Sequence, residues 1–155
     1  MQAHTTHHRF NPELTMTRPA THCANGPFDV QLSPQTLSTE AAASGLARMS
    51  IDKRFHGTLD ASSTGEMLAF RTPTDGSAGY VAMETVQGRL GDRRGSFVLQ
   101  HSSTMTRGKA TQSITVVPDS GTGALTGLAG CMTIDIAADG AHTYRFEFTL
   151  PEGAP

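Results

Sequence analysis

The chain has 155 residues, which suffices for one domain with a real hydrophobic core and is too short for two ordinary domains. Its formal net charge is −2 and it contains no basic block, so binding to nucleic acid through phosphate neutralisation is not expected. No apolar run approaches the ~18 residues that cross a bilayer, and no basic start precedes an apolar stretch. We therefore expect a cytoplasmic protein with no membrane partner.

The first 25 residues show neither helical nor strand periodicity and carry four of the seven histidines. We interpret residues 1–25 as a flexible N-terminal tail, residues 26–150 as the folded domain and residues 151–155 as a C-terminal tail. Histidines without fixed geometry or supporting groups do not make an ordered metal site. Neither a metal nor another cofactor is expected.

Short extended runs separated by turn signals follow the tail, with one short helical turn expected at Glu40–Leu46. Pro34 limits the first run to a sheet edge or a bend. The expected strands are Phe28–Leu32, Arg48–Leu59, Glu66–Thr72, Gly79–Leu90, Ser96–Met105, Gln112–Val117, Leu125–Ile136 and His142–Leu150. This number of closely spaced strands favours an all-β domain, either a closed barrel or a sandwich. Closure removes exposed strand edges, so we predict a single closed eight-stranded antiparallel barrel.

The hairpin Gly79–Leu90/Ser96–Met105 predicts a candidate site. A two-residue loop at Asp92-Arg93 places Glu84 opposite His101 on a face that is otherwise apolar. A buried carboxylate paired with an imidazole suits proton transfer, so these two are the candidate catalytic residues. A structural pair that fixes the register is the alternative, and a one-residue slip would set Glu84 against Gln100 instead.

Further polar and aromatic residues are candidates for substrate binding. In the strand Arg48–Leu59, alternation places Asp52 and Arg54 on one side and Lys53 on the apolar side. The charged side either holds a polar ligand head or is a solvated surface. Aromatic residues of the last strand are usually core, although the Tyr144 hydroxyl is available to a ligand. The predicted substrate-binding residues are Tyr144, Gln100, Arg54, Tyr80, Met105 and Phe146.

The glycine-rich stretch Ser120–Gly130 is not a phosphate-binding loop, because it lacks the Gly-Lys-Ser/Thr ending and the helix that follows. Its glycines fit a turn at Gly121 and Gly123. Gly127 and Gly130 fit points where a strand bends or a neighbouring side chain comes close.

Several segments carry a family resemblance: IDKRFHGTL (51–59), STGEML (63–68), GSAGYVAMETVQGRL (76–90), GSFVLQH (95–101) and VVPDSGTGALTGLAGCMTI (116–134). Together they resemble a bacterial family known only as a domain of unknown function, over about residues 28–150. That family is similar in fold to allene oxide cyclase, an eight-stranded barrel with a ligand cavity, and the glycine-rich stretch also resembles one in plant dirigent proteins. The resemblance implies cofactor-free ring closure or coupling of small molecules, and frequent homo-oligomers, but transfers no catalytic residue.

Three functions are consistent with these features. The first is a cofactor-independent isomerase, cyclase or lyase of biosynthesis, acting on an apolar small molecule inside the barrel, with Glu84 and His101 as acid–base partners. The second is a barrel that binds an apolar small molecule without chemistry. The third is a barrel filled with its own side chains that acts through its surface.

Overall fold

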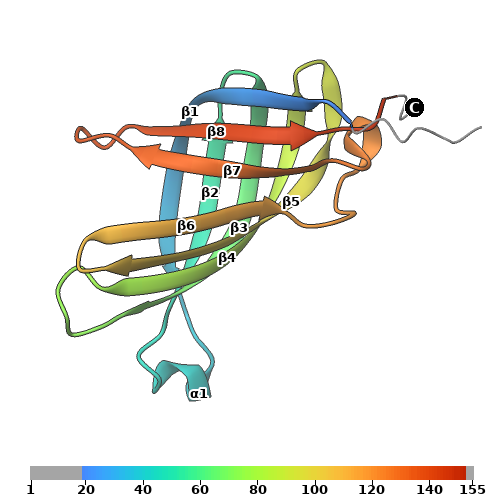
Figure 1. Ribbon diagram of the computed structural model, residues 1–155. Helices are drawn as coiled ribbons and strands as arrows, with labels where there is room; N and C mark the ends of the chain where they lie inside the picture. The colour runs from blue at the N-terminus through green and yellow to red at the C-terminus, as the bar shows by residue number, and fades with distance from the viewer. Residues whose placement is uncertain (1–18, 153–155) are drawn as a thin grey trace, which may run out of the picture.

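The computed structural model describes residues 19–152 as one closed barrel of antiparallel strands, which confirms the predicted fold (Figure 1). The strands are β1 (Thr21–Gln35), β2 (Ala47–Phe55), β3 (Leu59–Arg71), β4 (Ala78–Leu90), β5 (Arg93–Thr106), β6 (Lys109–Val116), β7 (Ala129–Ile136) and β8 (His142–Thr149). Each strand pairs with the next, and β8 pairs with β1. Within the described residues, the only helical pieces are α1 (Thr39–Ala42) and a 3-10 turn η1 (Gly123–Leu125).

The first strand begins earlier than expected. Thr21–Asn25 pair with β8, so the folded domain includes residues that lack a strand-like pattern and were assigned to the tail. Pairing with a strand far along the chain supplies the order that the local sequence does not. Residues 1–18 lie outside the described part of the chain, and so does the expectation of a flexible tail there.

Strand alternation fills the barrel with apolar side chains. The inward positions of β3, β4 and β5 hold residues such as Leu59, Val86 and Leu99, each at most 1% exposed. Phe97 stacks on Phe146 with ring centroids 5.6 Å apart and the planes nearly parallel. This half of the barrel is therefore a packed core.

The strand β1 bends at its middle, as Figure 1 shows. Its first half pairs with β8 and its second half with β2, and Phe28 takes part in both ladders. The second half pairs with β2 on one side and has no second ladder within the described chain. Pro34 lies in that half, where a missing backbone donor is tolerated. The prediction that Pro34 marks an edge or a bend is confirmed.

The wall between β6 and β7 is thin, because only two residue pairs join these strands. The strands diverge beyond that contact (Figure 1). The Gln112 side chain spans the gap: its amide accepts a hydrogen bond from Ile134 N at 2.8 Å and donates one to Ile134 O at 3.1 Å. The Gln112 side-chain amide thus takes the place of the backbone hydrogen bonds that one more residue pair would form between these strands.

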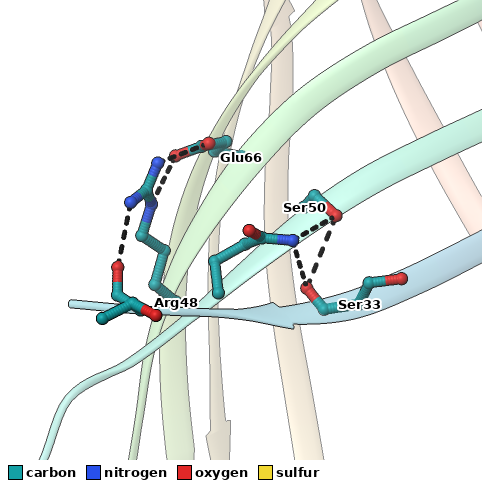
Figure 2. Close-up of polar contacts among 6 residues, drawn as sticks. Ser33, Arg48, Ser50 and Glu66 are labelled. Carbon is teal, nitrogen blue, oxygen red and sulfur yellow. Dashed lines mark hydrogen bonds and ion pairs between the residues drawn. The ribbon is translucent and has the colours of Figure 1, made fainter.

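The β1–β2 connection carries α1, which overlaps the helical turn expected at Glu40–Leu46 and begins one residue earlier. Ser38 caps it by accepting a hydrogen bond from Ala41 N at 3.2 Å, and Gly45 follows with a φ of +79°. Arg48 secures the connection from the outside. Its guanidinium donates two hydrogen bonds of 2.6 Å to Glu66 and one of 3.0 Å to Thr36 O (Figure 2).

Two expectations for the glycine-rich stretch are also met. A Cβ at Gly130 would lie 2.4 Å from Glu147 O and 2.9 Å from Phe148 Cβ, so the neighbouring strand comes too close for a side chain. Gly123 has a φ of +57° in η1, as its predicted place in a turn requires. The stretch shapes the barrel end and has no phosphate-loop geometry.

Candidate functional site: a buried ion cluster beside the barrel mouth

The hairpin that carries the site has a different register from the predicted one. The loop is Gly91-Asp92, so Leu90 pairs with Arg93, Glu84 lies opposite Leu99, and His101 lies opposite Ala82. The predicted direct pairing of Glu84 with His101 is wrong. The register is displaced by two residues, because the left-handed φ of +62° at Gly91 suits the first loop position. A two-residue displacement leaves every side chain on its face, so both groups still point inward.

Glu84 is the centre of a buried polar cluster. Its carboxylate accepts a hydrogen bond from Lys53 Nζ at 2.7 Å and another from Ser63 Oγ at 2.6 Å. His101 Nε2 lies 3.2 Å from the carboxylate oxygen Oε2 that Lys53 also contacts. All four residues are buried, and Glu84 is only 1% exposed. Four polar side chains from β2, β3, β4 and β5 therefore meet in an otherwise apolar interior.

The cluster holds Glu84 as an anion. Burial alone raises the pKa of this carboxyl, but the imidazole of His101, the ammonium of Lys53 and the hydroxyl of Ser63 outweigh burial and lower the pKa to about 2. A carboxylate with this pKa is a weak base at neutral pH. The environment of Glu84 suits a fixed negative charge better than the acid–base role expected from the sequence.

His101 is the cluster member with an unsatisfied group. Its Nε2 is buried and forms no hydrogen bond of acceptable geometry within the described chain, although Glu84 lies within ion-pair distance. We therefore attribute the fixed position of the Glu84 carboxylate to its hydrogen bonds with Lys53 and Ser63. A buried polar atom without a partner costs free energy, and such atoms concentrate at functional sites.

Sequence reasoning missed Lys53 and Ser63 as site residues. The signal for Lys53 lies in the alternation of β2, where Ile51 and Phe55 are buried on either side of it. Its ammonium also lies over the Phe28 and Phe55 rings, 5.5 and 5.8 Å from their centroids. No local signal marks Ser63, because serine is common on both faces of a strand.

A glycine makes room for the cluster. Gly65 is the cross-strand partner of Glu84, and a Cβ there would lie 2.2 Å from Met83 O and 3.1 Å from Glu84 Cβ. The backbone of β3 therefore approaches β4 closely where the carboxylate turns inward.

Beyond the cluster, toward the end of the barrel that carries α1, the inward face lines a cavity of about 460 Å³, here called the mouth cavity. Its inward-facing walls hold mainly Leu32, Met49, Met67, Ala69, Tyr80, Ser103 and Met105. The predicted binding residues Tyr80 and Met105 thus lie together in one cavity. Burial raises the pKa of the Tyr80 hydroxyl, and the charge of Glu84 adds to that rise.

Tyr144 and Phe146 belong to the packed core. The Tyr144 hydroxyl accepts a hydrogen bond from Leu59 N at 3.0 Å and donates one of 2.8 Å to His56 O, so it closes the β2–β3 turn. Phe146 is fully buried against Phe97 and Phe148. The structure gives both residues structural contacts and puts neither in the mouth cavity.

Replacing Tyr144 with Phe should therefore reduce stability without affecting any ligand in the mouth. The change leaves Leu59 N without its acceptor in a buried turn, and we expect a loss of about 1–3 kcal/mol in the free energy of unfolding. Urea denaturation measures this loss. Unchanged stability, or ligand affinity that falls with intact stability, would contradict the structural role.

Gln100 and Arg54 lie on the outer surface. Gln100 lines an external groove between α1 and the outer faces of β3–β5, together with the exposed Val81 and Met83. Arg54 is exposed and forms an ion pair with Asp60. Of the two alternatives for the charged face of β2, the solvated surface is the observed one. These two residues do not share a cavity with Glu84.

The described residues 19–152 contain no group of three or more His, Cys, Asp or Glu side chains arranged to hold a metal ion. In the same residues, no helix combines the length and the apolarity needed to cross a bilayer.

Comparison with known proteins identifies a family and no activity. The family model described as "Protein of unknown function (DUF3224)" matches residues 24–148. A solved crystal structure of a DUF3224 protein of unknown function from Shewanella oneidensis MR-1 is 46% identical. The match covers 85% of this chain and 99% of that chain, with a TM-score of 0.78. None of the curated proteins matches.

Proposed function

Because this chain belongs to the DUF3224 family, whose description assigns no activity, we propose a function from the geometry: the barrel binds an apolar small molecule in its mouth cavity. This proposal rests on a difference in packing between the two halves of the barrel interior. One half is filled by stacked aromatic side chains, whereas the other half leaves about 460 Å³ between adaptable methionines and small residues. Small-molecule sites are typically concave, apolar and supplied with a few polar groups.

The cavity walls suit such a ligand. Met49, Met67 and Met105 provide flexible apolar contacts, and the hydroxyls of Tyr80 and Ser103 provide polar ones. The charged cluster lies behind this wall, where the Lys53–Glu84 pair keeps its own charges satisfied. The cluster thus places polar groups in the apolar interior behind the cavity wall. Their charges are paired with each other, so no unpaired charge faces the cavity.

Two adjacent serines test the location of the ligand. Ser103 faces the mouth cavity, whereas Ser102 faces the external groove. Ser103→Trp should fill the cavity and weaken binding of the neutral fluorescent probe 1-anilinonaphthalene by at least about tenfold. Ser102→Trp should leave that affinity within about twofold.

The chain contains no tryptophan, so the introduced indole in each variant also reports its own position. A blue-shifted emission is expected for Ser103→Trp and a solvent-exposed emission for Ser102→Trp. Equal probe affinity in wild type and Ser103→Trp, with a buried indole, would overturn binding in the mouth. Loss of affinity in Ser102→Trp alone would assign the probe to the external groove.

A second candidate function is cofactor-independent isomerisation or cyclisation of the bound molecule. The buried Nε2 of His101 favours it, because within the described residues this nitrogen forms no hydrogen bond and lies 3.2 Å from the Glu84 carboxylate, an arrangement that suits proton transfer. In this proposal His101 moves the proton and Glu84 positions the imidazole, so that the two remain the acid–base partners expected from the sequence. The sequence resemblance to allene oxide cyclase predicts the same class of reaction, whereas the comparisons found the DUF3224 family, which has no assigned activity.

Turnover distinguishes the two candidates. Native mass spectrometry of the purified protein should show whether a co-purified molecule leaves unchanged or as an isomer. For an enzyme, we expect His101→Gln and Glu84→Gln to lower turnover by at least about 100-fold while the molecule still binds. Full turnover in both folded variants would eliminate the catalytic proposal and leave binding intact.

A further inference from the structure

The rim of the mouth cavity holds a solvent-exposed cation, Arg71. The β3–β4 register runs without interruption from Leu59 opposite Leu90 to Arg71 opposite Ala78. Leu59, with the buried Ala61 and Ser63, defines the inward face of β3, and Arg71 has the same parity. It is the last residue of β3 and lines the cavity. A guanidinium therefore lies where the apolar interior meets solvent.

Within residues 19–152, this guanidinium has no carboxylate partner. Among the described residues, the ion pairs involve Arg48, Lys53, Arg54, His56, His101 and Arg145, and Arg71 is absent from them. Asp75 is the acidic residue nearest in the chain and lines a small neighbouring pocket with Arg71, without an ion pair to it. The Arg71 charge is therefore available to a ligand.

Two more cations lie at the same edge. The β3–β4 loop and the β5–β6 turn are joined by hydrogen bonds from Gly108 N to Gly76 O at 3.0 Å and from Arg107 N to Ser77 Oγ at 3.1 Å. These contacts place Arg107 at the edge, beside Lys109 at the start of β6. Asp75 is the one acidic residue of these two connections, against the three cations Arg71, Arg107 and Lys109. This part of the rim is therefore positive, although the chain has a formal net charge of −2.

We infer that the mouth cavity takes an apolar molecule that carries one anionic group, with its apolar body among Leu32, Met49 and Met67 and its anion at Arg71. This inference rests on the proposed function and specifies the ligand. An anion at the rim remains partly hydrated, so it avoids the cost of burial while Arg71 offers planar, paired donors. The reverse orientation would bury the anion in the apolar interior, where Lys53 is already paired with Glu84 and offers no free cation.

Two fluorescent probes that differ by one anionic group test the inference. They are 1-anilinonaphthalene and its sulfonated form, 1-anilinonaphthalene-8-sulfonate. We expect wild type to bind the sulfonate about 3–10-fold more tightly at low salt, as a rim ion pair predicts. Arg71→Gln should remove this preference and leave the affinity for the neutral probe unchanged. Arg71→Lys should keep part of it.

Arg89→Gln provides the matched control, because Arg89 is exposed on β4 toward the opposite end and carries the same charge. It should not alter the preference for the sulfonate. Equal effects of Arg71→Gln and Arg89→Gln, or no effect of either, would overturn the inference. In that case, loss of both probes in Ser103→Trp would still support the mouth cavity as the binding site. If Ser103→Trp binds both probes normally, the proposed function and this inference both fail.

Discussion

Lys53→Met should destabilise the barrel by about 3–5 kcal/mol, the largest effect that we expect from one side chain of the site. The reason is the charge it leaves behind. Glu84 is 1% exposed, and without the ammonium it keeps only Ser63 as a hydrogen-bond donor. Methionine matches the length and apolar body of lysine, so the change tests charge more than volume. Urea or guanidinium unfolding at pH 7 measures the loss.

The adjacent residue supplies the control. Arg54→Met removes an exposed cation on the outer face of β2 and should alter the free energy of unfolding by no more than about 0.5–1 kcal/mol. Glu84→Gln in the Lys53→Met background should recover most of the loss, because both buried charges are then gone. A Lys53→Met variant as stable as Arg54→Met, or a double variant no better than Lys53→Met, would show that the two charges are not coupled.

The fold was predictable because it depends on sequence patterns that can be recognised even when the bounds of individual strands are predicted wrongly. Alternation, glycine turns and strand spacing predicted an eight-stranded antiparallel barrel, although the bounds of most strands moved. β1 is the clearest case: Thr21–Asn25 have no strand pattern of their own and become ordered by pairing with β8. Long-range pairing of this kind is not visible in a local window of sequence.

The site was predictable in part for the same reason. The wrong hairpin register kept Glu84 and His101 on the inner face, because the error was an even number of residues. Lys53 was on the apolar side of its strand, but only the structure shows its ammonium 2.7 Å from Glu84. Sequence alternation places a residue on a face, whereas its partners across the barrel depend on strand stagger and tilt.

Some of the predicted binding residues lie away from the mouth cavity, because their position along the barrel axis could not be predicted. Tyr144 and Tyr80 both face inward, yet one closes a turn in the packed half and the other lines the mouth cavity. Alternation has no information about depth, so it cannot separate these two tyrosines. Gln100 is next to His101 in its strand and therefore has its side chain on the opposite face, which agrees with its place in an external groove.

Acid should destabilise the barrel through Glu84, and this is the second large effect. The pKa of its carboxyl is about 2 in the folded protein, against an ordinary value of 4.5 in an unfolded chain. A lowered folded-state pKa gives stability that is fully present above pH 4.5 and is lost as the pH falls from 4.5 toward 2. The difference of about 2.5 units corresponds to roughly 3 kcal/mol.

The double variant Lys53→Met/Glu84→Gln isolates this contribution, because it lacks both the carboxylate and the ammonium that would otherwise remain buried alone. Its free energy of unfolding should fall less than that of wild type between pH 6 and pH 3, where Glu84 has lost part of its contribution. Glu66, whose pKa Arg48 lowers through its hydrogen bonds, titrates in the same direction in both proteins and cancels in the comparison. Parallel pH profiles of the two proteins would mean that Glu84 is not held as an anion. A flatter profile for the double variant would instead place the acid sensitivity of the barrel in the same buried cluster that forms the candidate site.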